Sequence, residues 1–508
     1  MSTRPTTIVS APGKVLLAGG YLVLDRQHQG LVIGANARFY SLVQSRSATP
    51  LASEAVAGLP SGFSVPIRIR SPQFLGASWS YELSCASATR QCTLRSQDTK
   101  RNPFVEIVLY YTFNLASHYL NDAALCPLLG QGFDITILGD NDFYSQRQSL
   151  AERGLLATTE ALRQLPAFNP TGTTLGAVHK TGLGSSAALV TSLVCALLLH
   201  FGLDKQGPVK ATKQPLRSPE FLTWVHNVAQ FCHCLAQGKI GSGFDVSAAV
   251  YGSHVYQRFS PTVLEPIMPA NANVLDAPAV DSVALMHILA PTATAWDNLV
   301  SPIALPPGFT MMLADVDAGS HTPSMVSKVL AWRKTNPTEA QRIWNALGGL
   351  NQTLVGLFNC LQQLASEDAT SYRVAIAQCA GFPAAQWKMQ ATTATAKVQS
   401  IITAIANVTQ TFEKIRAHLR AVGEHADVPI EPPQQTALLD CCMDLPGVVM
   451  AGVPGGEQAS VAVETLWCNW QGLAVSPLLV HESSQGLQCY ADTDPQFAPY
   501  VEPSNCAF

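Results

Sequence analysis

Residues 180–190 read Lys-Thr-Gly-Leu-Gly-Ser-Ser-Ala-Ala-Leu-Val, and an apolar run follows. Glycine has no Cβ, so Gly182 and Gly184 allow a sharp turn that points several backbone N–H groups into one cavity. We expect a helix to begin here and to continue to about His200. The N–H groups and dipole of a helix start attract anions, and Lys180 adds a full positive charge. The segment therefore predicts a phosphate-binding loop.

Two other nucleotide-binding patterns and one purely structural interpretation compete with this prediction. The glycine spacing across residues 182–187, with Asp204 further along, fits the dinucleotide fingerprint, but no second strand separates the helix from Asp204. A Walker A loop has its lysine after the glycines, whereas the lysine here precedes them. An ordinary loop that caps a buried helix through Ser185 and Ser186 would explain the glycines and serines alone. The lysine together with the paired serines favours phosphate.

Composition excludes several classes of partner. The chain has 508 residues, of which 47% are hydrophobic and 13% are charged, so it has enough apolar residues for two or more buried cores. Lysine and arginine number 31 against 35 acidic residues, so neither nucleic acid nor an anionic membrane is expected as the main partner. The apolar run of residues 187–203 is too short to span a bilayer.

The cysteines and the N-terminal sequence predict a cytoplasmic protein with free thiols. Thirteen cysteines are spread over a long chain, without the dense, even spacing of a secreted scaffold. The first residues contain no apolar segment typical of a secretory signal. Cys232, His233 and Cys234 lack the spacing of zinc ligands, and a partly buried helix explains them better.

Two further segments place charged residues next to glycines. Residues 8–17 are expected to form a strand, a tight Pro-Gly turn and a second strand, with Lys14 just after the turn at the rim of a sheet. Alone, Lys14 would be interpreted as a solvated turn lysine. Residues 238–249 form a glycine-rich turn that puts Asp245 at the start of a helix of small residues, beside Lys239. Asp245 either caps that helix or positions a metal, a lysine or an acceptor, and the segment alone leaves both open.

Apolar periodicity supplies the remaining elements. Helices are expected over residues 104–119, 219–237, 325–333, 337–365 and 392–422, with Gly423 ending the last of them. Strands are expected over residues 133–137, 309–316, 448–453 and 461–463. Residues 140–172 are expected to form a long loop, and the chain after about residue 485 to be loose.

Three separated motifs resemble the GHMP superfamily of small-molecule kinases: Ala11-Pro12-Gly13-Lys14, the loop of residues 182–187, and the glycine-rich segment 452–456. The narrower similarity, to phosphomevalonate kinases of fungal type, rests on Ser10 to Asp25, Lys180-Thr181, Gly238 to Asp245, Gly319 to Pro323, and Pro429-Ile430-Glu431-Pro432. The resemblance implies an α+β fold of two domains. Residues 1–290 would form the ATP-binding domain, similar to ribosomal protein S5, and residues 291–508 a ferredoxin-like domain, with substrates in the cleft between them.

The resemblance also implies the site residues and the cofactors, ATP and Mg²⁺. Contacts to the ATP phosphates would come from Lys180, Gly182, Leu183, Gly184, Ser185, Ser186 and Ala187, with the Ser186 hydroxyl on Mg²⁺. Catalysis would involve Lys14 and Asp245. A small phosphorylated acceptor would contact Lys239, Ser242, Ser320, Thr322, Gly455 and Gly456.

Elementary chemistry divides the work between the two catalytic candidates. A phosphate monoester has a second pKa near 6 and is largely a dianion at neutral pH, so it scarcely needs a general base. The barrier is repulsion between two charged phosphates, which lysines, Mg²⁺ and fixed N–H groups reduce. Asp245 is therefore predicted to orient Lys14 or the metal rather than to remove a proton.

One motif departs from the family pattern, which reads roughly Gly-x-Pro-Gly-Ala-Gly-Gly-Tyr-Asp-Ala. The corresponding residues 453–460 are shorter, lack the aspartate and contain Glu457. Two alternatives therefore stay open beside a phosphomevalonate kinase: another GHMP kinase such as mevalonate kinase, and a ligand-binding protein of the same fold without turnover. The sequence does not distinguish a monomer from a homodimer.

Overall fold

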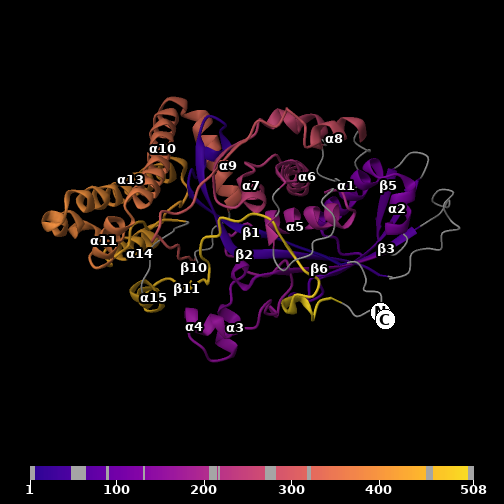
Figure 1. Ribbon diagram of the computed structural model, residues 1–508, viewed down its shortest axis with the longest axis horizontal. Helices are drawn as coiled ribbons and strands as arrows, with labels where there is room; N and C mark the ends of the chain where they lie inside the picture. Colours follow the sequence, from indigo (N-terminus) through magenta and orange to yellow (C-terminus); the bar gives the residue numbers. More distant parts are fainter. Residues whose placement is uncertain are drawn as a thin grey trace.

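A large mixed sheet, covered by helices, joins distant parts of the chain (Figure 1). The computed structural model describes residues 6–46, 64–86, 91–129, 132–204, 214–215, 218–268, 282–316, 322–453 and 461–501. In these ranges the strands are β1 (Thr6–Ala18), β2 (Gln29–Ser45), β3 (Ser64–Arg70), β4 (Ser78–Ala86), β5 (Gln91–Ser96), β6 (Phe133–Gly139), β7 (Gln214–Pro215), β8 (His254–Gln257), β9 (Leu299–Pro302), β10 (Ala314–Val316), β11 (Val475–Pro477) and β12 (Gln488–Tyr490). The mixed α+β class expected for a GHMP kinase is confirmed.

The sheet follows the order β5-β4-β3-β6-β2-β1-β12-β7, with β8 and β9 attached beside β2. Its pairs are antiparallel apart from β3 with β6. The central strands are almost wholly buried, because helices cover one face and a mixture of short helices and the C-terminal segment lies on the other (Figure 1). Strands β9 and β12 reach this sheet from beyond residue 290, and the domain boundary at that residue stays a prediction.

The predicted Pro-Gly turn in residues 8–17 is wrong. Strand β1 runs continuously through this segment, and a bulge between Pro12 and Lys14 shifts its register against β2. The bulge leaves Gly13 so close to the 182–187 loop that a Cβ would lie 3.0 Å from the Leu183 carbonyl oxygen. A β-bulge redirects the following side chain, and Lys14 points toward that loop as a result.

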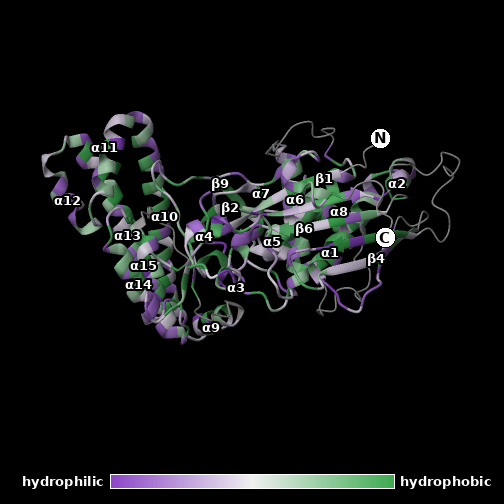
Figure 2. Cartoon of the chain, turned by 90° about the horizontal axis from the view of Figure 1, so that it is seen from below, coloured by the Kyte–Doolittle hydropathy of each residue, from purple (hydrophilic) through white to green (hydrophobic). Residues whose placement is uncertain are grey.

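The helices are α1 (Pro103–Tyr119), α2 (Asp122–Leu129), α3 (Arg147–Glu152), α4 (Thr159–Arg163), α5 (Ser185–His200), α6 (Pro219–Gln237), α7 (Phe244–Tyr251), α8 (Ser282–Leu289), α9 (Thr322–Thr335), α10 (Pro337–Glu367), α11 (Ala369–Ala380), α12 (Trp387–Gln390), α13 (Ala396–Ala426), α14 (Pro433–Met443) and α15 (Val461–Cys468). Helix α5 packs on β1 and β2, with α1, α6 and α7 around it. Figure 2 shows that this part of the molecule is predominantly hydrophobic. The helices predicted at 104–119 and 219–237 are confirmed, whereas the predicted loop 140–172 contains α3 and α4.

A second group of elements, mainly helical, lies at the other end of the molecule (Figure 1). The long helices α10 and α13 pack against each other, and each buries an apolar face. Helix α13 does not end at Gly423 but continues to Ala426, with Asp427 in the left-handed conformation at its end. Gly423 is needed inside the helix because a Cβ there would lie 2.6 Å from the carbonyl oxygen of Val428.

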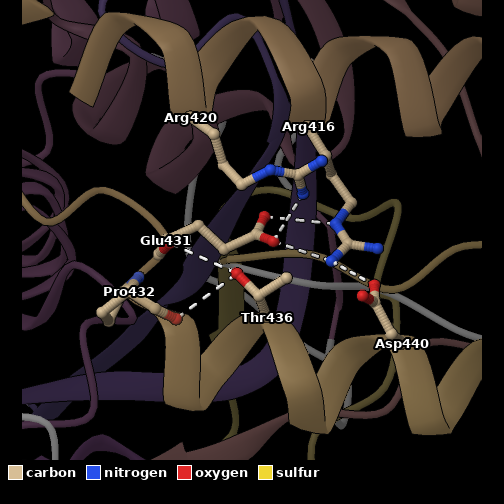
Figure 3. A network of polar contacts seen from close by, with 6 residues as sticks. All are labelled: Arg416, Arg420, Glu431, Pro432, Thr436 and Asp440. Atoms are coloured by element: carbon tan, nitrogen blue, oxygen red, sulfur yellow. Dashed lines mark hydrogen bonds and ion pairs between the residues drawn. The ribbon is translucent and has the colours of Figure 1, made fainter. Parts of the chain in front are cut away.

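A polar network fixes α13 against the following segment and α14 (Figure 3). Glu431, only 4% exposed, accepts hydrogen bonds from Arg416 at 2.7 and 3.1 Å and from Arg420 at 2.8 Å. Arg416 also bonds to Asp440 of α14 at 3.0 Å. Gly452, which begins the third glycine-rich motif, lies against this helix because a Cβ would be 2.7 Å from the Phe412 ring.

Several strand predictions in the last third of the chain are wrong. Residues 461–463 begin helix α15, and residues 448–453 belong to no strand. Of the predicted strand 309–316, only the last three residues pair, as β10 with β11. Alternating β-branched residues favour a strand locally, but neighbouring elements decide the outcome.

Residues 486–501, which were expected to be loose, are packed in place. Tyr490 of β12 pairs with Ile8 of β1, and Phe497 is fully buried against Tyr40. The buried guanidinium of Arg38 donates to the carbonyl oxygen of Gly486 at 2.5 Å.

The prediction of free thiols is wrong for one pair, since Cys85 and Cys92 form a disulfide between β4 and β5. The other described cysteines are free thiols. None of the helices in the described ranges is both long enough and apolar enough to cross a membrane.

Candidate active site

The loop before α5 has the conformation that its glycines predicted. Gly182 and Gly184 have φ values of 83° and 79°, in the left-handed region. Helix α5 begins at Ser185, with Gly184 as its N-cap and no side-chain capping bond. The predicted capping by Ser185 and Ser186 is therefore wrong, because both lie inside the first turn. The helix start keeps N–H groups that no side chain caps, which is the arrangement that binds anions at helix N-termini.

Lys14 reaches this loop from the bulge in β1. Its backbone N–H donates to the Leu183 carbonyl oxygen at 2.9 Å, and its Nζ donates to the Gly182 carbonyl oxygen at 2.7 Å. The lysine stem lies against Gly184, where a Cβ would be 3.1 Å from the Lys14 Cε. Burial lowers the pKa of Lys14, and the carboxylate of Asp245 opposes that shift. The lysine is thus a half-buried cation attached to the loop rather than a solvated turn residue.

Helix α7 places Asp245 on the opposite side of the same space. Its N-cap, Gly243, has a φ of 86°, and a Cβ there would lie 2.7 Å from both the Gln230 Oε1 and the Tyr256 hydroxyl. Only glycine therefore fits this turn. The Asp245 side chain is 23% exposed, and its Oδ1 accepts a hydrogen bond from the backbone N–H of Val246 at 3.0 Å in the first turn of α7, which leaves Oδ2 on the side of His233. The carboxylate can therefore interact with a ligand as well as with its neighbours.

A histidine for which the sequence indicated only a place in a partly buried helix joins the two sides. His233, on α6, has its Nε2 atom 3.0 Å from the Ser186 Oγ and 3.9 Å from the Asp245 Oδ2. Burial lowers the pKa of His233; Asp245 opposes this and Lys239 adds to it. The imidazole is therefore neutral near pH 7. Its position between Cys232 and Cys234 in an apolar helix gave no sign of this contact.

A cleft of about 590 Å³ opens beside the start of α5. Ser185, Ser186 and Lys180 line one side of it. Its other walls combine apolar and aromatic side chains with cations, including Leu75, Trp79, Phe104, Leu189, Lys100 and Arg101. Clefts of this size that combine apolar walls with a few polar groups commonly bind small molecules. Apolar periodicity indicated only a core role for Phe104, so the sequence did not predict that this residue lines the cleft.

Of the other residues predicted to contact ATP, some can do so only through the backbone and one through an exposed side chain. The side chains of Leu183 and Ala187 are buried, so only their backbone groups can reach a ligand. Lys180 is exposed, and its backbone forms a bridge with Tyr144.

The structure describes only some of the residues that were predicted to contact the acceptor. Ser320, Gly455 and Gly456 lie outside the described residues, and Thr322 begins α9 without a described side chain. Lys239 is exposed just after the end of α6, and Ser242 is half-buried. Ser242 accepts a hydrogen bond at its carbonyl oxygen from the Tyr256 hydroxyl at 2.9 Å.

Arg258 connects the loop that carries these two residues to the segment after β1. Its guanidinium donates to the carbonyl oxygens of Ile240 and Gly241 at 3.1 and 2.8 Å, and to that of Leu24 at 2.6 Å. One side chain therefore fixes the 238–243 loop relative to the segment after β1. Isolated in the sequence after β8, Arg258 gave no sign of this role.

Comparison with known proteins gives a consistent set of relatives. The chain is 38% identical over 512 residues to the Arabidopsis thaliana protein named phosphomevalonate kinase, peroxisomal, covering 96% of this chain and 97% of the relative. It is 37% identical over 472 residues to a phosphomevalonate kinase of Aspergillus fumigatus, covering 88% and 84%. No family model matches the chain.

Among solved structures, the Lin0012 protein from Listeria innocua has a similar fold. The TM-score is 0.56 at 14% sequence identity, over 96% of this chain and 99% of that protein. At this identity the likeness concerns the fold alone.

Proposed function

The chain belongs to the phosphomevalonate kinase family, and from this premise we propose how its site works. The enzyme phosphorylates (R)-5-phosphomevalonate to 5-diphosphomevalonate, with ATP as donor, in the mevalonate pathway. The observation that carries the assignment of the site is the start of α5. It has no side-chain cap, it opens on a cleft, and the cation of Lys14 lies against it.

ATP binds with its phosphates at the 182–187 loop and its base in the neighbouring cleft. The helix dipole and backbone N–H groups favour the phosphates, and Lys180 adds charge at the mouth. Trp79 and Phe104 offer aromatic surfaces for the base, and Lys100 also lines the cleft.

The reaction itself needs charge neutralisation more than proton removal. An oxygen of the acceptor phosphate attacks the γ-phosphorus, the bond to the β–γ bridging oxygen breaks, and ADP leaves. Because the acceptor is already largely a dianion, no proton has to be taken from it. Lys14 stabilises the charge on the transferring phosphoryl group, and Asp245 orients Lys14 and would help to hold Mg²⁺.

The residues present fit Mg²⁺. This ion prefers oxygen ligands and is usually bound by one or two protein groups together with substrate phosphates. Ser186 and Asp245 supply oxygens that face the same small space, because both approach the Nε2 of His233. Among the described residues, no group of three or more His, Cys, Asp or Glu side chains could hold a metal without such phosphates. When bound, Mg²⁺ neutralises part of the triphosphate charge.

Turnover assays with two acceptors test this function. Purified protein with Mg²⁺ and ATP is expected to release ADP with (R)-5-phosphomevalonate, and ³¹P NMR is expected to show a new diphosphate. ADP release with mevalonate instead would favour the mevalonate kinase alternative. Tight nucleotide binding without ADP release would favour the ligand-binding alternative, and would direct attention to the short third motif.

The acceptor is expected to bind next to the 238–243 loop, so replacing Arg258 by glutamine should mainly weaken acceptor binding. The variant loses hydrogen bonds to three carbonyl oxygens, which frees the loop carrying Lys239 and Ser242. We expect the KM for phosphomevalonate to rise about tenfold, with a smaller change in the KM for ATP. The exposed Arg342→Gln variant is the control. An equal rise in both KM values would contradict the role assigned to Arg258.

The subcellular location of the protein needs a test of its own. The sequence predicts a cytoplasmic location, while the name of the plant relative points to peroxisomes. Microscopy of a fluorescent fusion, with the tag placed at either end in turn, would distinguish the two.

A further inference from the structure

His233 takes no part in the proposed reaction, yet its ring lies between two residues that do. The side chain is 4% exposed and sits one turn before the end of α6. Three polar groups surround its Nε2: the Ser186 Oγ and the Gln237 Nε2, both at 3.0 Å, and the Asp245 Oδ2 at 3.9 Å. These groups come from three helices, α5, α6 and α7, so the imidazole connects the elements that form the site.

The Gln237 contact fixes the tautomer of the imidazole. An amide nitrogen only donates hydrogen bonds, so with the Gln237 amide in this orientation Nε2 is the unprotonated, accepting nitrogen. A hydroxyl beside an accepting nitrogen can only donate to it, so the Ser186 O–H points its hydrogen at His233. The lone pairs of the Ser186 oxygen are then directed away from the imidazole and toward the cleft that Ser186 lines.

The surroundings hold the ring in this orientation. The Phe104 ring lies 6.0 Å from it, centre to centre, at an interplanar angle of 40°. Phe104 also lines the cleft, so one wall of the cleft supports the imidazole directly. Neighbours that orient a ligating group typically change metal affinity or activity 10–100-fold when removed.

We propose that His233 is a positioning residue, which turns the Ser186 oxygen toward the metal–nucleotide complex. The inference rests on the proposed function, because it assigns Ser186 and Asp245 to that complex. It adds a residue to the site whose role is to orient others rather than to touch the substrates.

Binding of a non-hydrolysable ATP analogue by calorimetry tests the proposal without turnover. His233→Leu removes the acceptor and keeps an apolar side chain of moderate size. We expect its Kd for the analogue to rise about tenfold with Mg²⁺ and less than twofold with EDTA. His233→Gln can again offer an accepting oxygen to Ser186, so it should recover part of the loss. In kinetics, His233→Leu should lower kcat about tenfold or more and leave the KM for phosphomevalonate within twofold.

His226 provides the matched control, because it is equally buried on the same helix but bonds to Asn227 instead of Ser186. His226→Leu should leave the Mg²⁺ dependence of the Kd unchanged, even if it lowers the melting temperature. A purely structural role for His233 would follow if both leucine variants changed binding alike, or if His233→Leu bound the Mg²⁺ complex like wild type; either result overturns the proposal. Failure of the proposed function is seen separately, as wild-type protein that does not convert phosphomevalonate.

Discussion

Replacing Lys14 by methionine is expected to lower kcat about a thousandfold while the protein stays folded. Methionine keeps most of the stem that lies against Gly184, so the loop before α5 retains its support. What is lost is a half-buried cation whose Nζ donates a hydrogen bond to the Gly182 carbonyl oxygen of the phosphate loop. Charge developing between two phosphates in a water-poor site is stabilised more strongly by such a cation than by one in bulk water.

Asp245→Asn is the informative comparison, and we expect this substitution to lower kcat about tenfold. If Asp245 orients Lys14 and the metal, an amide of the same shape keeps part of that function. If Asp245 were the general base that starts the reaction, Asp245→Asn would lower kcat more than the Lys14 substitution does. Single-turnover rates with phosphomevalonate would show the order directly, and Lys388→Met, at an exposed position on α12, controls for removal of a surface charge. The reverse order would contradict the electrostatic mechanism.

Local signals in the sequence located the centre of the site well. Three signals predicted α5, α6 and the start of α7: the glycines at 182 and 184, the apolar run after them, and the helical pattern before Gly238. Each signal lies within a few residues of the helix end that it determines. The same locality explains the errors. Pro12 and Gly13 have turn chemistry, but pairing along β2 keeps β1 continuous and converts the turn into a bulge.

Contacts between distant segments could not be predicted from one sequence. Ser186 and His233 are 47 positions apart, and nothing in a Cys-His-Cys stretch on an apolar helix distinguishes a site residue from a core residue. The packing of Phe497 depends on β12 pairing with the first strand of the chain, almost five hundred residues earlier. Residues 461–463 are rich in valine, yet they begin a helix, because neighbouring elements bury the apolar side of α15. Leu438 is one of the residues that pack against it.

The second large effect is expected on stability, at Glu431. Replacing it by glutamine should lower the free energy of unfolding by about 3 kcal/mol at neutral pH. The substitution removes the carboxylate between Arg416 and Arg420 and leaves the buried guanidinium of Arg416 with Asp440 alone, whose side chain is 62% exposed (Figure 3). Urea unfolding followed by circular dichroism measures the change. Glu339→Gln is the matched control, because it removes the same kind of charge from an exposed pair on α10, and no measurable change is expected there.

The pH dependence separates an ionic role for Glu431 from a packing role. Burial alone would raise the pKa of Glu431, but the hydrogen bonds and charges of Arg416 and then Arg420 outweigh it and lower the pKa below its usual value. A carboxyl group whose pKa is lowered by folding stabilises the protein fully above its unfolded pKa, about 4.3, and loses that contribution as the pH falls through the folded value. The difference between wild type and Glu431→Gln should therefore be constant from pH 6 to 8 and shrink as the pH falls below about 4.3. A difference that stays the same down to low pH would mean that the side chain stabilises this region by its shape and hydrogen bonds, and the ionic account of the α13–α14 contact would be wrong.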